Sequence, residues 1–236
     1  MAHLTDTRNR YELKYLVAAR DVSSIRAELG EYLTTDEHGD PEWGYAVYSV
    51  YWDSPDYSLF WEKVEGLMVR RKVRLRRYVG SDELFLEIKQ RVDRTQQKRR
   101  LRMSVAEARD RFVTHPGDDV TDPVMREAWT LFRRHNLAPR CAIRYRRRAF
   151  MGRYEPALRV NFDTRIQYRV TGFDLVTPFD TGAAVLDPRT AVMEVKFTGG
   201  APLWLTKAIA RMGLPMVRMS KYCSAVDRAV YGGALT

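Results

Sequence analysis

Short segments of this chain alternate between apolar and charged residues, and that alternation restricts what they can fold into. In a β-strand, successive side chains point to opposite faces of the sheet. Residues 84–90 read LFLEIKQ, so leucine and isoleucine share one face while Glu87 and Lys89 share the other. The same division recurs in residues 12–17, 73–78, 158–164 and 192–197. The sequence therefore predicts strands with one apolar face and one face of mixed charge.

The predicted strands come in short consecutive runs, which favours antiparallel neighbours. They cover residues 10–17, 45–53, 68–79, 84–92, 96–103, 140–150, 157–170 and 191–197. Helices are expected at 21–33, 57–66, 104–112 and 122–136, and two more at 202–213 and 220–233, which we expect to pack on the outside. Only loop-sized linkers separate these elements. The sequence predicts a single α+β domain over residues 1–236.

Two arrangements suit such strands. An ordinary antiparallel sheet would pack its apolar face on helices and leave its polar face in water. Alternatively, about eight strands suffice to close a small barrel. A pair of one acid and one lysine two positions later recurs at residues 12–14, 87–89 and 194–196. This repeat favours an eight-stranded antiparallel closed β-barrel, a tunnel with a charged interior surrounded by helices.

Cations outnumber acids on the predicted inner face. Two like charges about 6 Å apart cost roughly 3 kcal/mol at an effective dielectric constant near 20. The cations are Lys14, Arg74, Arg76, Lys89, Lys98, Arg100, Arg147, Arg159 and Lys196, and the acids are Glu12, Glu87, Asp163 and Glu194. A chain of phosphates would relieve the repulsion, and arginine suits phosphate oxygens. Because the carboxylates would repel phosphate unless a hard divalent cation lay between them, the predicted ligand is a metal–oligophosphate complex.

Composition narrows the function classes further. The net charge of +10 favours polyanionic partners. Cys141 and Cys223 form no CxxC motif, so reduced thiols are expected, and the four scattered histidines show no zinc-ligand spacing. No apolar stretch has the length of a signal peptide or of a transmembrane helix, so we expect no membrane segment and a cytoplasmic protein. The sequence leaves the oligomeric state open.

Seven segments taken in order resemble a known family. They are residues 10–17 (RYELKYLV), 48–78, 85–100, 143–150 (IRYRRRAF), 158–164, 192–197 (VMEVKF) and 220–223 (SKYC). Together they resemble the VTC domain, the polyphosphate polymerase branch of the triphosphate tunnel metalloenzyme (CYTH-like) superfamily. The resemblance runs through nearly the whole chain and implies a tunnel of eight antiparallel strands.

The resemblance also implies an activity and a site. It implies ATP as the phosphoryl donor, a growing polyphosphate chain as the acceptor, and Mn²⁺ or Mg²⁺ as the cofactor. The residues that it places at the reacting phosphates are Lys14, Arg74, Arg76, Lys89 and Lys196. The further phosphate-binding residues that it implies are Lys63, Lys98, Arg147, Arg159, Ser220 and Lys221. Arg100, an inward position of the strand alternation, is expected to join them. The metal ligands would be Glu194, Glu87 and Glu12.

One departure from the superfamily bears on the activity. Hydrolase and cyclase relatives carry Glu-x-Glu-x-Lys at the first strand, whereas the matching positions here are Arg10, Glu12 and Lys14. The missing glutamate argues against a triphosphatase and agrees with the polymerase branch. Three functions stay open: a polyphosphate-forming transferase, a triphosphatase in the same tunnel, and a non-catalytic binder of polyphosphate or RNA. No RNA-binding motif with interleaved aromatic residues is visible, so we expect no nucleic-acid partner.

Alternatives also stay open for individual residues. Glu87 and Glu194 would serve as partners of arginines in internal salt bridges if they held no metal. Arg144, Arg146 and Arg148 alternate with the inward positions of their strand, so they are expected to face away from the tunnel as a solvated edge.

Overall fold

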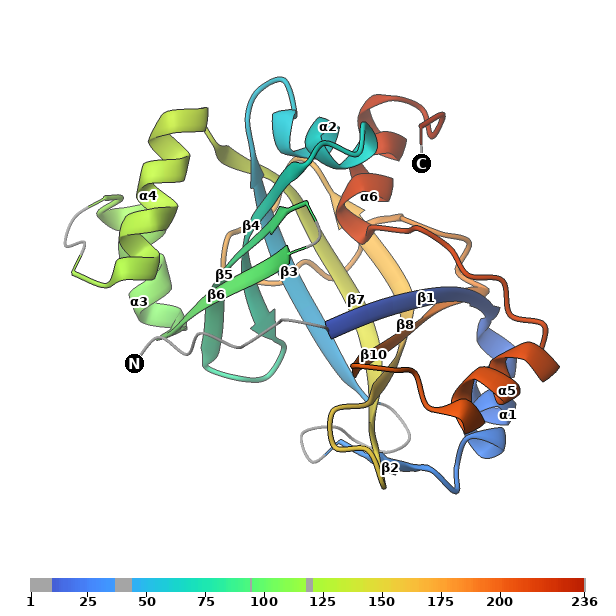
Figure 1. Cartoon of the computed structure of the whole chain (residues 1–236). Helices are drawn as coiled ribbons and strands as arrows, with labels where there is room; N and C mark the ends of the chain where they lie inside the picture. The colour runs from blue at the N-terminus through green and yellow to red at the C-terminus, as the bar shows by residue number, and fades with distance from the viewer. Residues whose placement is uncertain (1–9, 37–43, 94, 118–120, 236) are drawn as a thin grey trace.

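One curled antiparallel sheet organises the fold (Figure 1). The computed structural model describes residues 10–36, 44–93, 95–117 and 121–235. Eight long strands follow the order β1-β10-β8-β7-β3-β4-β5-β6, while the short β2 pairs with β7 and the short β9 with β8. The strands are β1 (Arg10–Ala18), β2 (Leu33–Thr35), β3 (Tyr45–Asp53), β4 (Val69–Tyr78), β5 (Glu83–Val92), β6 (Thr95–Ser104), β7 (Ala138–Gly152), β8 (Arg159–Arg169), β9 (Ala183–Ala184) and β10 (Thr190–Thr198). The predicted α+β class and antiparallel sheet are confirmed.

Local sequence explains why these segments are strands. β3 reads YAVYSVYWD, a run of aromatic and β-branched residues that favours extended backbone. β4, β5 and β6 follow one another through tight connections, and Gly80 takes a left-handed φ of 97° in the first of them. The resulting ladders set Arg74 opposite Glu87 and Glu87 opposite Arg100. The register therefore aligns charges across three neighbouring strands.

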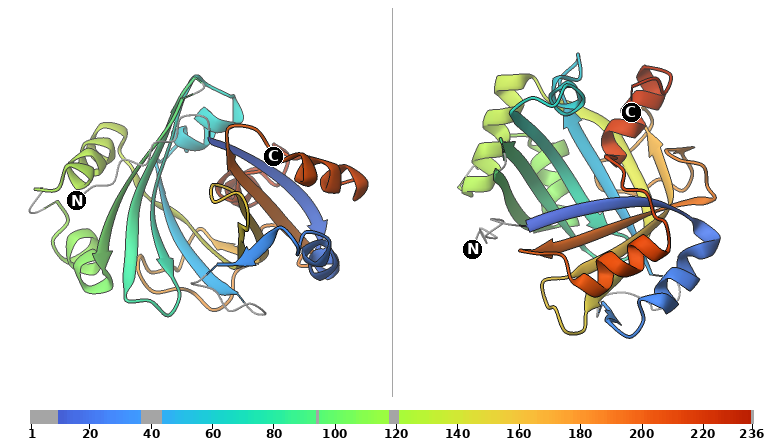
Figure 2. Two further views of the ribbon diagram at one scale, coloured as in Figure 1. Left: turned by 60° about the horizontal axis from the view of Figure 1, so that its bottom comes forward. Right: turned by 45° about the vertical axis from the view of Figure 1, so that its right-hand side comes forward.

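Helices cover the apolar face of the sheet on its outer side, as both views in Figure 2 show. α3 (Val105–Arg109), the π-helical turn η2 (Asp110–Thr114) and α4 (Pro123–His135) pack on β3 to β6, where Trp52 stacks on Phe132 at 5.5 Å. α1 (Val22–Glu28), which follows the short 3₁₀ turn η1 (Ala19–Asp21), and α5 (Leu203–Arg211) pack on β1, β8 and β10. The opposite, charged face is therefore the concave one.

The helix starts follow their capping signals. The Ser104 side chain accepts from the Glu107 amide and the Glu107 carboxylate accepts from the Ser104 amide, which completes a capping box at α3. Asp122 accepts from the first amides of α4, ahead of a proline. The helix predicted over residues 21–33 is wrong at its end. α1 stops at Glu28, and Leu33 is buried in β2, where strand pairing overrides the helical spacing.

α6 (Lys221–Val230) corrects a second expectation. It was expected on the outside, but it packs with α2 (Ser58–Val64) against residues of the concave side. The ring of Tyr222 stacks on Tyr51 of β3 at 4.9 Å, and Tyr51 lies opposite Arg74 in the ladder. The amphipathic spacing of this segment predicts that one of its faces is buried, but it does not say which surface buries it.

The predicted closed barrel is not confirmed, because the ring has no ladder between its end strands. Among the described residues, β1 and β6 end the path of paired strands without pairing with each other. Part of the outer edge of β1 is taken by the chain between α5 and α6. Tyr15 forms an antiparallel bridge with Met216, and the Val217 amide donates to the Lys14 carbonyl at 2.8 Å. The structure shows a strongly curled half-barrel.

Candidate functional site

Charged and phenolic side chains gather on the concave side of the sheet, and we call this set the charged face. Strand register assigns its members, because residues directly opposite in a ladder point the same way. They are Glu12, Lys14, Tyr51, Lys72, Arg74, Arg76, Glu87, Lys89, Lys98, Arg100, Tyr145, Arg147, Asp163, Glu194 and Lys196. Most of the residues predicted for the site therefore do share one surface.

Two acids, Asp163 and Glu194, hold the first charged cluster together, and Asp163 is fully buried. Arg147 donates to both of its carboxylate oxygens at 2.7 Å, a bidentate pair, and Lys221 of α6 lies 2.5 Å from Oδ2. Burial alone would raise the pKa of Asp163, but Arg147 and Lys221 outweigh burial and lower it. Asp163 thus stays ionised and holds two cations in place. The sequence had placed it on the inner face without giving it a role.

Glu194 of β10 is the second acid of this cluster. Its oxygens lie 2.7 Å from Lys221 Nζ, 2.9 Å from Lys196 Nζ and 3.1 Å from Arg147 Nη2. Lys14 lies further away, at 3.8 Å, and forms a 3.1 Å ion pair with Glu12. Burial opposes ionisation, yet these cations hold the pKa of Glu194 well below its usual range. Four cations therefore converge on one carboxylate.

Glu87 organises a second cluster on β4, β5 and β6. Its side chain is completely buried, and Arg74 donates to Oε2 at 2.6 and 2.8 Å. Arg100 donates to Oε1 at 2.6 and 2.9 Å, and Lys98 lies 2.8 Å from the same oxygen. Burial would raise the pKa of Glu87, but Arg74, Arg76 and Lys98 hold it well below its usual range. Both oxygens of Glu87 are thus occupied by cations.

Arg76 and Lys89 lie between the two clusters. Arg76 donates to the Tyr145 hydroxyl at 2.9 Å, while its own Nε is buried without a hydrogen-bond partner among the described residues. Lys89 makes no hydrogen bond or ion pair within the part of the chain that the structure describes. Burial and the charge of Arg74 lower its pKa well below the usual range, against the attraction of Glu12 and Glu87. Since Glu12 is on β1 and Glu87 on β5, the charges of distant strands meet at Lys89.

The N-terminus of α6 adds a third group of contacts. Ser220 caps the helix and accepts from Lys72 Nζ at 2.6 Å, while Lys14 Nζ donates to the Met219 carbonyl at 2.9 Å. Lys63 of α2 lies close enough to Lys72 for its pKa to be lowered by burial and by that neighbouring charge. Ser220, Lys221 and Lys63, predicted from the resemblance alone, thus lie beside the charged face.

Lys72 and Arg159 depart from the expectations. Lys72 was not predicted, although its spacing of two from Arg74 is the signal that would have placed it on the charged face. Arg159 was predicted to bind phosphate. Its side chain is 46% exposed and turns to Asp36, 3.5 Å away, and to the Met151 sulfur rather than to Glu194 or Glu87. Arg159 therefore belongs to neither the Glu194 cluster nor the Glu87 cluster.

The positions of the carboxylates indicate whether the charged face can bind a divalent cation. Within residues 10–36, 44–93, 95–117 and 121–235, no group of three or more His, Cys, Asp and Glu side chains is placed to hold a metal ion. Burial and the nearby charge of Glu194 both act to raise the pKa of Glu12, but Lys196 and Lys14 lower it well below its usual range. A hard divalent cation often takes one or two protein carboxylates and completes its shell with substrate phosphates. The oxygen donors here fit a metal that arrives with its phosphates.

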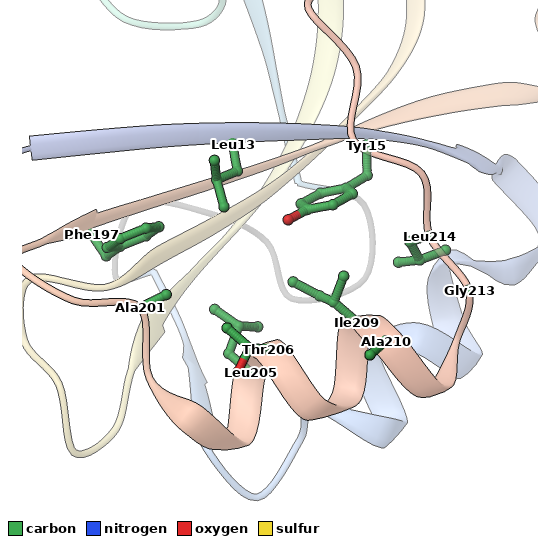
Figure 3. A pocket seen from close by; sticks show the side chains of 10 residues that line it. All are labelled: Leu13, Tyr15, Phe197, Ala201, Leu205, Thr206, Ile209, Ala210, Gly213 and Leu214. Atoms are coloured by element: carbon green, nitrogen blue, oxygen red, sulfur yellow. The ribbon is translucent and has the colours of Figure 1, made fainter.

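A separate hollow between α5 and the strands β1 and β10 has a different chemistry (Figure 3). It encloses about 230 Å³ and is lined by Leu13, Phe197, Leu205, Ile209 and other residues without charge. Tyr15 and Thr206 supply its only polar side-chain atoms among the residues that line it. Such a wall offers nothing to neutralise a phosphate, so this hollow is not part of the anion site.

Structural comparison supports the fold. A Bacillus halodurans protein described as a candidate adenylate cyclase superposes with a TM-score of 0.52 at 12% identity, over 90% of this chain and 95% of that one. A Vibrio parahaemolyticus protein with a similar description gives a TM-score of 0.45 at 10% identity, over 92% and 97% of the two chains. Only the first likeness is strong enough to bear on the fold.

Sequence comparison decides the family. A search of curated proteins returns no match. The model of the VTC domain matches residues 9–230, which is nearly the whole chain. The order of the motifs, the curled antiparallel sheet and the charge pattern on its concave face agree with this match. The chain therefore belongs to the VTC domain family.

Proposed function

We propose that this protein transfers the γ-phosphoryl group of ATP to a growing chain of inorganic polyphosphate. The observation that carries the proposal is the imbalance of charge on the charged face and the start of α6. Ten cations face four carboxylates there, an excess of six positive charges among the described residues. The cations are Lys14, Lys72, Arg74, Arg76, Lys89, Lys98, Arg100, Arg147, Lys196 and Lys221, and the acids are Glu12, Glu87, Asp163 and Glu194.

Phosphoryl transfer requires that the protein position the phosphates and neutralise their charge. In phosphoryl transfer, catalysis comes mainly from aligning the phosphates and stabilising the charge on their oxygens. The acceptor is already an anionic phosphate oxygen, so no general base is assigned. Among the described residues, Lys72, Arg76 and Lys89 make no ion pair with a carboxylate, and Lys72 donates to Ser220 instead. We assign Arg76 and Lys89 the first contacts with substrate. Lys14, Arg74 and Lys196 are proposed to join them at the reacting phosphates.

A divalent cation, Mn²⁺ or Mg²⁺, completes the proposal. Glu194, with Glu12 close by, would hold it, and when bound it would neutralise phosphate charge. Glu87 was a third candidate ligand. Cations occupy both oxygens of Glu87, as they do those of Glu194. The neighbouring charges that shift the pKa of Glu87 are cations, whereas Glu194 has the carboxylate of Glu12 nearby. We therefore assign Glu87 the alternative role of a salt-bridge partner that orients Arg74, Lys98 and Arg100.

We also propose that the half-barrel forms a tunnel around its phosphate ligand. The charges of β1 and β5 already reach each other at Lys89, so a chain of phosphates lying along the charged face would contact strands from both ends of the sheet. Lys98, Arg100, Arg147, Ser220, Lys221 and Lys63 are proposed to line the course of that chain. Such a ligand would close the half-barrel by its own contacts and not by a ladder of strand hydrogen bonds.

The test is a gel assay for polymer made from ATP, with and without Mn²⁺. The Arg74→Ala/Arg76→Ala variant should lower polymer synthesis by about 100-fold or more, because it removes two cations that we propose contact the reacting phosphates. The matched control is Arg133→Ala/Arg134→Ala, which removes two exposed arginines from α4. Circular dichroism checks that both variants fold.

Each result of this assay has a distinct meaning. Polymer from the wild type and the control, but not from the Arg74→Ala/Arg76→Ala protein, supports the proposal. Phosphate release without polymer would identify a triphosphatase. Salt-dependent binding of polyphosphate without turnover would identify a binder. Normal synthesis by the folded double variant would show that the charged face is not the site.

A further inference from the structure

A second basic hollow lies on the other side of the sheet from the charged face. It encloses about 420 Å³ beside β7, β8 and β9, and its lining includes Arg144, Arg146, Arg165, Gln167 and Leu186. Arg146 neighbours Arg147 in β7, so strand alternation turns it away from the charged face. The sequence predicted that Arg144 and Arg146 form a solvated edge. The structure instead places both in the wall of a cavity.

An irregularity between β7 and β8 creates this hollow. Arg144 lies opposite Gln167, but Arg146 lies opposite Thr164, so two residues of β8 face the single residue between the arginines. This is a β-bulge, which bends a strand and re-aims its side chains. One of these two residues of β8 is Arg165, with a left-handed φ of 49°. That backbone is unfavourable for any residue but glycine, yet an arginine occupies it.

The guanidinium groups of the hollow are poorly matched by acids. Arg144 donates to the carbonyls of Phe179 and Asp180 at 2.7 and 3.0 Å, and lies 3.7 Å from the fully exposed Asp180 carboxylate. Arg146 Nε is buried without any hydrogen-bond partner in the described part of the chain. No ion pair of Arg146 or Arg165 occurs there either. A buried donor that lacks an acceptor is costly, and an anion in the hollow would supply the acceptor.

We propose that this hollow is a second anion site that binds a small molecule through its phosphate groups. The planar fork of arginine matches phosphate oxygens, and about 420 Å³ falls within the range of small-molecule sites. Leu186 and Pro188 give the wall an apolar part, so the phosphate can be inorganic or carried by an organic group. Tyr145, whose hydroxyl accepts from Arg76 on the charged face, also lines the hollow, but Arg144 and Arg146 alternate with it and point away from that face. The occupancy of the hollow does not depend on the function proposed above.

The variants isolate this hollow from the rest of the surface. Arg146→Ala removes the unpartnered guanidinium. Arg165→Gly removes a second one, and glycine suits the left-handed backbone, so this variant is expected to fold. The control is Arg148→Ala, which removes the next arginine on the same face of β7 but does not line the hollow. None of the three touches the charged face.

The measurement is calorimetric titration of wild type and variants with pyrophosphate and, separately, with ADP. The wild type should bind at two classes of site. Arg146→Ala and Arg165→Gly should each weaken one class by about tenfold, the effect of losing one charge-assisted hydrogen bond, whereas Arg148→Ala should weaken neither. Hydrogen exchange should slow in residues 164–168 and 180–188 of the wild type when ligand is added.

The two ligands separate the possible sources of phosphate. Equal affinity for pyrophosphate and ADP identifies an inorganic phosphate site, and a clear preference for ADP identifies a nucleotide site. The proposal is overturned if only one class of site is found and neither variant changes it. It is also overturned if Arg148→Ala weakens binding as much as Arg146→Ala. The loss of any one positive charge on this face would then explain the weaker binding. Polymer synthesis is measured apart, so its outcome leaves these results unaffected.

Discussion

Lys89 is the residue whose environment says most about the charged face. An ammonium group that is buried among arginines and has no ion pair loses its proton more easily than one in water. Burial and Arg74 lower the pKa of Lys89 well below its usual range, and burial lowers that of Lys98 to about 8 against the pull of Glu87. Without an anion, the charged face therefore gives up part of its positive charge. A phosphate ligand would restore that charge.

This coupling predicts a pH dependence of binding. A bound phosphate raises the pKa of Lys98 from about 8, so binding takes up a proton in the window between the free and bound pKa values. Affinity for tripolyphosphate should therefore be highest below about pH 8 and should fall as the pH rises above it. Lys98→Arg, whose guanidinium stays protonated, should flatten that fall.

Calorimetry in buffers of different ionisation enthalpy measures this proton uptake directly. The exposed lysine of α5 provides the control, because Lys207→Arg should leave the pH profile unchanged. An affinity that stays level between about pH 8 and pH 10 would mean that Lys98 and Lys89 are already charged in the free protein.

Replacing Glu87 should lower the free energy of unfolding. Replacing it with glutamine keeps the shape but leaves Arg74, Arg100 and Lys98 without their shared counter-ion in a buried setting. Removing one partner of a buried ion pair typically costs about 3–5 kcal/mol of unfolding free energy. Glu87→Gln should therefore unfold at clearly lower denaturant concentration.

The control for Glu87 lies on the same strand. Glu83 pairs with Arg102 where both side chains are substantially exposed, so Glu83→Gln should change the unfolding free energy by less than about 1 kcal/mol. Added tripolyphosphate should destabilise neither variant and should recover part of the loss in Glu87→Gln. Equal stability of the two variants would contradict the central position given to Glu87.

At the scale of elements, α6 connects the helical layer with the charged face. Asp53 ends β3, is fully buried, and accepts from the amides of Leu59 and Phe60 at the start of α2 at 2.8 and 3.0 Å. It also accepts from the Tyr222 hydroxyl of α6. One carboxylate thus joins a strand and two helices. Through α6 it fixes Ser220 and Lys221, which contact Lys72, Asp163 and Glu194.

Tyr222→Phe tests this junction. It removes one hydrogen bond to a buried carboxylate, which should lower the unfolding free energy by about 1.5–3 kcal/mol. Because α6 carries two groups of the proposed site, affinity for tripolyphosphate should fall as well. Tyr32→Phe is the control, since the Tyr32 hydroxyl has no hydrogen-bond partner in the described ranges. Unchanged stability and affinity in Tyr222→Phe would show that packing alone holds α6.

The sequence predicts strands better than it predicts how helices dock. Period-two alternation correctly separated Glu87 and Lys89 from their apolar neighbours, because only one face of a strand can meet the apolar core. The same rule applied one step further would have found Lys72. The docking of α6 was missed, because Asp53 and Tyr222 are separated by 169 positions and no local pattern links them. The bulge at Arg165 was missed for the same reason.

For the molecule as a whole, the sheet bends the charges of seven strands toward one another. The excess of cations on the concave side works against the folded state, and a polyanion that binds there removes the repulsion. The alternation of residues predicted this face, but the path of paired strands ends open between β6 and β1. A closed barrel would need β6 to pair with the outer edge of β1. The Met216–Val217 segment occupies part of that edge.

Ligand binding should therefore stabilise the whole domain. Tripolyphosphate at 100 times its dissociation constant should add about 2.7 kcal/mol to the unfolding free energy. For a chain of this size, that corresponds to a rise of about 5–10 °C in the melting temperature. Sodium chloride at equal ionic strength is the control and should give a much smaller rise. Equal effects of the two salts would indicate general screening without a site.

The pairing of β1 with β10 also sets the order in which the protein can be made. Arg10 meets Thr198, so the first strand must wait for residues near the end of the chain before it finds its neighbour, and its other edge waits for Met216. During synthesis on the ribosome, that strand leaves the exit channel long before either partner. Such distant pairings slow folding and leave an unprotected edge open to other chains, so β1 should find its place only after Met216 has been synthesised.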